Sequence, residues 1–176
     1  QKQIEAARLN LDELSEIAQQ AYTDIREVIF NLRTRTPGHA EFINHLGEYL
    51  ATYQACFGIR TTITAQEEAG AGISDDKADQ IMYIIQEALT NIRKHSRADL
   101  VEVKLSIAGP NLLVEIVDNG IGFDPSEWGE DHSWRHLGLQ IMWERAEAIG
   151  GKLEIDSLPG QGTRVRLTVP AAVMSL

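Results

Sequence analysis

One helical stretch of this sequence carries polar residues whose types and spacing suit phosphate and metal chemistry. Glu87 is followed by Asn91, Lys94 and His95 at positions i+4, i+7 and i+8. On a regular helix, residues at this spacing lie on one stripe of the surface. A carboxylate, an amide oxygen, an ammonium and an imidazole in line suit phosphates and a hydrated Mg²⁺, which takes few protein oxygens and keeps its waters. The alternative is a solvated helix face, and the stripe taken alone favours that alternative.

A second motif, Asp-Asn-Gly-Ile-Gly at 118–122, follows the apolar residues 112–117. Gly120 and Gly122 permit tight turns and a close approach of a ligand to the backbone. Asp118, at the end of the predicted strand, would face the floor of a pocket and accept a hydrogen bond from an exocyclic amine. The alternative is a plain strand-ending turn, because Asp-Asn-Gly is common in turns. The motif is not a dinucleotide-binding fingerprint, because no helix opens there and a third glycine is missing.

Two further glycine motifs are modest when each is taken alone. Gly138 and Leu139 open a predicted helix, whose free N–H groups and positive dipole end could bind phosphate. An ordinary helix N-terminus explains them equally well. Residues 160–163, Gly-Gln-Gly-Thr, lie between the last two predicted strands and could form a simple hairpin that ends in Thr163. The order and spacing of the four motifs carry more weight than any one of them.

The elements that position these motifs are predicted from periodicity and from breaking residues. Ser74 is a plausible N-cap, and Asp75 and Asp76 would occupy the favourable first turn of its helix. Helices and strands mixed in one small unit predict the α+β class, as a two-layer α/β sandwich with its helices on one face of a sheet. Helices are expected at about 39–57, 74–96 and 137–149, and strands at about 59–64, 100–107, 112–117, 152–157 and 163–169.

Residues 1–36 are predicted to form a separate, long helix of the dimerisation type. Its apolar residues alternate in steps of three and four, the heptad pattern of a helix packed in a left-handed supercoil. A helix lying against its own domain is the alternative. Thr-Pro-Gly at 36–38 breaks the pattern, so we expect a boundary between 1–36 and a domain at 37–176. The apolar residues are Ile4, Ala7, Leu11, Leu14, Ala18, Ala21, Ile25, Val28 and Leu32.

Composition excludes several classes of protein. The net charge of −10 argues against a nucleic-acid partner, because such proteins usually present a basic face. Cys56 is the only cysteine, which excludes an internal disulfide and fits a reducing cytosol. No apolar run approaches the roughly 20 residues that span a bilayer. A start at Gln1 rather than Met suggests a processed or excised fragment.

In order, the motifs resemble the conserved boxes of histidine-kinase ATPase domains. Residues 85–95 look like the N box, 117–123 and 136–139 like the two glycine boxes, and 160–163 like the last-strand box. This resemblance implies the Bergerat-type ATP-binding fold of the GHKL superfamily, shared with type II topoisomerases, the Hsp90 chaperone and the MutL repair protein. The residues within the boxes are similar to those of the subclass that contains the nitrate/nitrite sensors and DesK. Residues 1–36 resemble the second helix of that subclass's dimerisation and phosphoacceptor hairpin.

The resemblance implies ATP and Mg²⁺ as ligands and gives each matching residue a role. Asp118 would bind the adenine amino group, and Thr163 would assist through water. Asn91 would coordinate Mg²⁺, while Glu87 would bind a water of the metal or act as a base. Lys94 and His95 would meet phosphates or ribose. The resemblance also implies that six further residues contact the nucleotide: Gly120, Gly122, Phe123, His136, Gly138 and Leu139.

The stretch from Phe123 to Leu137 would form a lid over the nucleotide. Arg135 departs from the family pattern, which usually has a glycine immediately before His136. The departure falls at the hinge of the lid, although Arg135 could equally reach a phosphate.

The implied function is transfer of the ATP γ-phosphate to a histidine, for relay to a response regulator in two-component signalling. The family's acceptor lies in a Leu-His-Asp context on the first hairpin helix, and none of the five histidines here lies in the first helix. We therefore expect a fragment without its acceptor, homodimeric through 1–36 and belonging to the cytoplasmic part of an inner-membrane sensor kinase. The membrane-associated segments would lie outside this sequence.

Two other readings of the function stay open. An ATP-hydrolysing clamp of the chaperone or repair type would use Glu87 to activate water, but the sequence lacks that group's large middle domains. A degenerate module that binds nucleotide without catalysis conflicts with the intact boxes, while Arg135 keeps it open.

Overall fold

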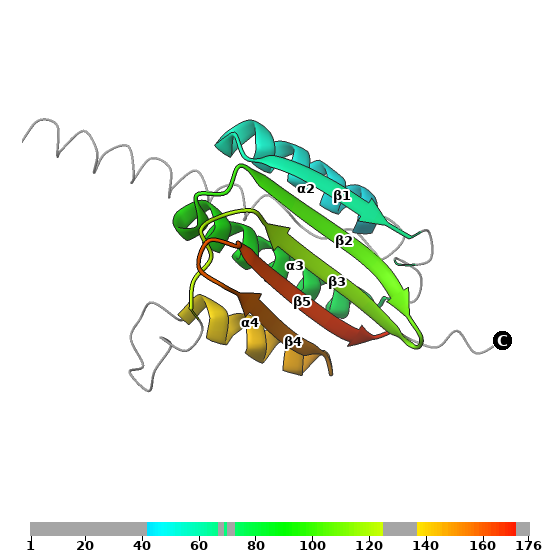
Figure 1. The fold of residues 1–176 in the computed structure, drawn as a ribbon. Coiled ribbons are helices and arrows are strands. Elements are labelled where there is room, and N and C mark those ends of the chain that lie inside the picture. Colours follow the sequence, from blue (N-terminus) through cyan, green and yellow to red (C-terminus); the bar gives the residue numbers. More distant parts are fainter. Residues whose placement is uncertain (1–41, 67–68, 70–72, 125–136, 172–176) are drawn as a thin grey trace, which may run out of the picture. The chain divides into compact units, whose positions relative to one another are not determined.

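The computed structural model describes residues 42–66, 69, 73–124 and 137–171 (Figure 1). The chain divides into two units, Gln1–Arg35 and Thr36–Leu176, and only the second contains described residues. The predicted heptad helix and its dimer lie outside the described residues, as do Arg135 and His136. These remain predictions.

The described residues form a five-stranded sheet with order β1-β2-β3-β5-β4, in which β1 runs parallel to β2 and the other neighbours are antiparallel. Helices α2, α3 and α4 cover one face of this sheet (Figure 1). The predicted two-layer α/β sandwich is therefore confirmed. The elements are α2 (Phe42–Phe57), β1 (Arg60–Ala65), α3 (Asp75–Asn91), the π-helical turn η3 (Ile92–Ser96), β2 (Leu100–Ala108), β3 (Asn111–Asp118), α4 (Leu137–Ala148), β4 (Lys152–Ser157) and β5 (Thr163–Pro170).

The alternation along β3 determines where Asp118 lies. Leu112, Val114 and Ile116 are buried among the core residues, and the intervening positions are only partly covered. Successive side chains of a strand point to opposite faces, so Asp118 continues the buried series. It is 4% exposed. The sheet thus places one carboxylate at the end of an apolar row, on the face that the helices cover.

The opposite face of the sheet carries a row of alternating charges. Lys104, Glu115, Arg166 and Glu154 are register partners across β2, β3, β5 and β4. Two guanidinium nitrogens of Arg166 donate to Glu115 Oε1, each at 3.2 Å. Opposite charges on neighbouring strands favour this pairing, and their partial exposure marks the face as solvated rather than as a second core.

Helix α3 begins as predicted but does not end as a regular helix. Ser74 occupies the N-cap with extended backbone (φ −70°, ψ 156°), although its side chain makes no capping hydrogen bond. The last turn, η3, is π-helical, and Arg97 follows it in the left-handed region with φ 55°. A π-turn holds more residues than an α-turn, so the regular spacing used for the polar stripe holds from Glu87 to Asn91 and not beyond.

Candidate functional site

Asp118 is a buried carboxylate surrounded by hydrogen-bond donors. Its Oδ1 accepts a bond of 2.7 Å from the Gly120 N–H. Burial raises the pKa of Asp118, while the backbone N–H groups of Gly120 and Thr163, and then the nearby hydroxyls of Ser96 and Thr163, act in the opposite direction. A buried charge is tolerated only with such partners. The donors orient the carboxylate at the end of the sheet.

Backbone packs against backbone around this carboxylate. At Gly120, an added Cβ would lie 2.6 Å from Ser96 Cβ and would clash with the Ser96 carbonyl. At Gly162, which has φ +73°, it would clash with the Asp118 carbonyl. At Gly122, with φ +58°, it would come within 2.8 Å of the Gly162 carbonyl oxygen. The structure therefore requires glycine at Gly120 for space, and at Gly122 and Gly162 for both space and conformation.

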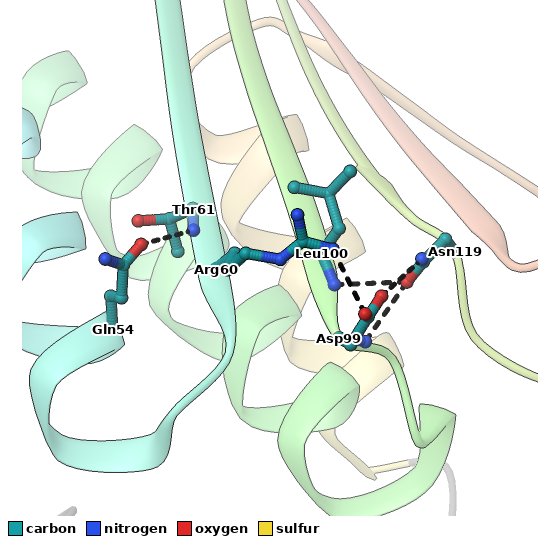
Figure 2. Close-up of polar contacts among 6 residues, drawn as sticks. All are labelled: Gln54, Arg60, Thr61, Asp99, Leu100 and Asn119. Carbon is teal, nitrogen blue, oxygen red and sulfur yellow. Dashed lines mark hydrogen bonds and ion pairs between the residues drawn. The ribbon is translucent and has the colours of Figure 1, made fainter.

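Asn119 fixes the loop that follows Asp118 (Figure 2). Its Oδ1 accepts bonds of 3.1 Å from the N–H groups of both Asp99 and Leu100, and its Nδ2 donates to Asp99 Oδ1 at 2.6 Å. The bond from Asn119 is the largest cause of the lowered pKa of Asp99, followed by the bond from Arg60. Asn119 therefore joins the end of β3 to the start of β2.

Ser157 is a polar residue that the sequence motifs did not identify. Its Oγ accepts a bond of 2.9 Å from the Phe123 N–H and lies 3.0 Å from the Gly162 carbonyl oxygen and 3.0 Å from Thr163 Oγ1. The available signal is positional, because Ser157 occupies a buried position at the end of β4, on the same side as buried Leu153. A serine at such a position needs hydrogen-bond partners.

On the helical side, the structure brings Glu87 and Gly138 together. A Cβ added to Gly138 would clash with Glu87 Oε1 and lie 3.0 Å from Glu87 Cδ. Gly138 lies in the first turn of α4, where backbone N–H groups have no partner within the helix. Leu139 follows it and is half-buried. The carboxylate of α3 and the N-terminus of α4 therefore share one location.

Asn91, one turn beyond Glu87, has an unusual environment. Its Nδ2 is buried and has no hydrogen-bond partner. Leaving a buried amide unpaired costs about 1–3 kcal/mol. An uncompensated polar group of this kind suits a position that a ligand completes.

A cluster of basic residues lies beyond Asn91, at the end of α3. The last turn contains Arg93, Lys94 and His95, of which Lys94 and His95 are exposed. Burial, and then the charges of Lys94 and Arg93, lower the pKa of His95. The guanidinium of Arg93 lies 5.3 Å from the centroid of the Phe57 ring. Positive charge thus gathers at the end of α3 in a chain whose net charge is −10.

Other features lie apart from this site. Within residues 42–66, 69, 73–124 and 137–171, no group of three or more His, Cys, Asp or Glu could hold a metal ion. None of the described helices is long and apolar enough to cross a membrane. A groove of about 610 Å³ between α2 and β1 is lined by Ile43, Asn44, Gly47, Glu48, Ile63 and Ala65, none of them a predicted site residue.

Comparison with known families shows which family the chain belongs to. Residues 76–173, more than half of the chain, match the family described as "Histidine kinase-, DNA gyrase B-, and HSP90-like ATPase". The chain belongs to this ATPase family. The family resemblance seen in the motifs is confirmed, and the matched segment runs from the start of α3 to just beyond β5.

Relatives in the ATPase family include sensor kinases. An uncharacterized sensor-like histidine kinase of Chloroflexus aurantiacus is 32% identical over 93% of this chain and 28% of its own length. The oxygen sensor histidine kinase NreB of Staphylococcus carnosus is 32% identical over 84% of this chain and 41% of its own length. The chain thus spans less than half of either relative.

A solved structure supports the fold. The histidine kinase domain of the blue-light activated kinase EL346 from Erythrobacter litoralis aligns with a TM-score of 0.61 at 22% identity, covering 74% of this chain and 61% of that one. At this identity the likeness concerns the fold alone.

Proposed function

We propose that the chain is the ATP- and Mg²⁺-binding catalytic domain of a sensor histidine kinase. It transfers the γ-phosphate of ATP to a histidine on another helix, for relay to a response regulator. The observation that carries this proposal is Asp118, a buried carboxylate oriented by hydrogen bonds at the end of the sheet. It occupies this position in a chain of the ATPase family.

In this proposal Asp118 recognises adenine. Its ionised carboxylate accepts a hydrogen bond from the exocyclic amine, and Thr163 assists through water. Gly120 and Gly122 support this role, because their backbone lies close to the carboxylate and leaves no room for side chains. Guanine presents a carbonyl oxygen where adenine has its amine, so the carboxylate discriminates against guanine.

The triphosphate lies toward α3 and α4. Asn91 coordinates Mg²⁺, and Glu87 holds a water of the metal or acts as a base. Mg²⁺ would bind this amide through its oxygen, Oδ1, and the unpaired Nδ2 could then donate to a phosphate oxygen. When bound, Mg²⁺ neutralises charge on the phosphate oxygens.

The remaining residues surround the nucleotide. Lys94 and His95 meet phosphates or ribose from the basic end of α3, and the N–H groups of Gly138 and Leu139 face the nucleotide at the start of α4. Phe123, Arg135 and His136 belong to the lid. The chain contributes positioning and charge neutralisation, which are the main protein contributions in phosphoryl transfer.

The proposed partners follow from the same assignment. Residues 1–36 form a homodimer, and the acceptor helix and the response regulator receive the phosphoryl group in turn. The complete protein is proposed to be a sensor at the inner membrane, with this domain on the cytoplasmic side.

Labelled ATP tests the proposal. The chain is incubated with γ-labelled ATP and Mg²⁺, alone and with an added helix that carries a Leu-His-Asp acceptor, and then with a response regulator. We expect acid-labile label on the added helix only, and Asn91→Ala should suppress it. Release of phosphate without transfer would support the hydrolysing clamp, and nucleotide binding with neither reaction would support the degenerate module. Histidine-linked label on the chain itself would contradict the missing acceptor.

A further inference from the structure

Ser157 lies outside all four sequence motifs, yet it contacts two of them. We propose that Ser157 is a positioning residue for adenine recognition, which turns the hydroxyl of Thr163 toward Asp118. The inference rests on the proposed function and adds a residue to it. Ser157 acts through Thr163 and does not touch the nucleotide.

The register of the sheet places these side chains in one row. Asp118 is the partner of Thr163 across β3 and β5, and Thr163 is the partner of Ser157 across β5 and β4. Directly opposed residues share a face and hold their Cβ atoms about 4.5–5.5 Å apart. The order Asp118, Thr163, Ser157 is therefore fixed by the backbone.

Ser157 and Thr163 each have a single hydroxyl proton, so each side chain can donate only one of the hydrogen bonds in this row. Ser157 Oγ and Thr163 Oγ1 lie 3.0 Å apart, and either can donate. If Ser157 donates to Thr163, the proton of Thr163 is free to bond to Asp118. If Thr163 donates to Ser157 instead, Asp118 loses that bond and Ser157 turns its own proton to the Gly162 carbonyl, 3.0 Å away.

The ionised carboxylate favours the first arrangement. A bond to a carboxylate is stronger than a bond between neutral groups, so the Thr163 proton goes to Asp118 while Asp118 is charged. The N–H of Phe123 donates to Ser157 Oγ at 2.9 Å. Donors and acceptors in a chain polarise one another, so Phe123, Ser157 and Thr163 together strengthen the bond to Asp118.

Nucleotide titrations of Ser157→Ala test this role. We expect the affinities for ATP and ADP to fall by the same factor, roughly threefold to tenfold, because one hydrogen bond is weakened at the adenine end. Hydrogen bonding from Thr163 lowers the pKa of Asp118. Weakening that bond should therefore move the acid limb of nucleotide binding to higher pH.

A matched pair of variants separates the hydroxyl from the shape of the side chain. Thr and Val have the same shape and both suit a strand, but only Thr keeps a hydroxyl. Ser157→Thr should therefore keep the wild-type affinity and pH profile, whereas Ser157→Val should lose affinity as Ser157→Ala does. Ser74→Ala is the control, because Ser74 is exposed and makes no side-chain capping bond. The pair also decides the question if Ser157→Ala fails to fold.

The outcomes distinguish this inference from the proposed function. If the wild-type chain binds no adenine nucleotide, the proposed function fails, and this inference fails with it. If the wild type binds ATP and Ser157→Val equals Ser157→Thr in both affinity and pH profile, only the role of Ser157 is overturned. A loss for ATP without a loss for ADP would also overturn it, because the effect would then lie at the phosphates.

Discussion

The two ends of the candidate site differ in how far the protein alone completes them. At the proposed adenine end, Asp118 has donors around it, and glycine backbone packs closely beside it. At the proposed phosphate end, Asn91 has a buried nitrogen without a partner, and Lys94 and His95 are exposed. Under the proposed function, this difference means that the fold prepares recognition of the base and leaves the metal and phosphate side for the ligand to complete.

The elements explain this contrast. Asp118 and Thr163 lie on neighbouring strands of the sheet, where register fixes each side chain. The basic residues instead lie on the last turn of α3, which is π-helical. Such turns are frequent at functional sites and place side chains at angles that a regular helix does not offer.

The largest effect is expected for Asp118→Asn. The carboxylate that is proposed to accept the adenine amine becomes an amide of similar shape, so the affinity for ATP should fall by about 100-fold or more. The fold should remain, as circular dichroism would show. Titration calorimetry is the measurement, and equal ATP affinity in the variant would mean that the adenine end has been assigned wrongly.

Asn91→Ala should separate the two ends. The variant should lose the Mg²⁺-dependent part of ATP binding, by roughly tenfold or more, and should keep the metal-independent part. Its stability without nucleotide should not fall by more than about 1 kcal/mol, because the side chain that is removed has an unpaired buried nitrogen. Titrations with and without Mg²⁺, together with urea unfolding, check both statements, and a large loss of stability would refute the contrast.

A pair of glycine variants measures how tightly the adenine end is packed. Gly122 and Gly109 have similar angles, φ +58° and φ +61°, but only Gly122 has backbone atoms where a Cβ would stand. Gly109→Ala should cost about 1–2 kcal/mol of unfolding free energy for the left-handed conformation. Gly122→Ala should cost about 1–3 kcal/mol more, because the added carbon is forced into packed backbone. Equal urea midpoints for the two variants would deny the close packing.

The smallest effect concerns pH. Burial raises the pKa of Asp118 above its unfolded value, so the folded chain binds this proton more readily than the unfolded chain does. The contribution of Asp118 to stability is therefore present at low pH and is lost as pH rises from the unfolded to the folded pKa. Nucleotide binding should change in the opposite direction and weaken as Asp118 becomes protonated. Comparing unfolding and ATP titrations across acid pH with Asp118→Asn isolates this carboxylate, and parallel trends would contradict the account.

Much of the fold followed from the sequence because its patterns are local. The apolar strand before Asp118, the glycines after it and the N-cap at Ser74 all depend on neighbouring residues. The same motif predicted tight turns at Gly120 and Gly122, whereas the packing of their backbone against other backbone is seen only in the structure. The roles of these residues toward a nucleotide remain proposals.

The rest depended on contacts between distant parts of the chain. Ser157 lies in none of the motifs, and its proposed role follows only from its register with Thr163. The π-turn escaped prediction because a 3.6-residue period was extended from Glu87 to His95. The contact between Glu87 and Gly138 joins two helices that are far apart in the sequence.

A comparison of ATP with GTP tests the central claim most directly. Both nucleotides have the same phosphates and bind the same metal, so the Mg²⁺ side of the site treats them alike, and only the base differs. Titration of the chain with each nucleotide in the presence of Mg²⁺ should show ATP bound and GTP weaker by about 100-fold or more, because the carboxylate of Asp118 meets a carbonyl oxygen instead of an amine. Equal affinity for the two nucleotides would show that Asp118 does not read the base.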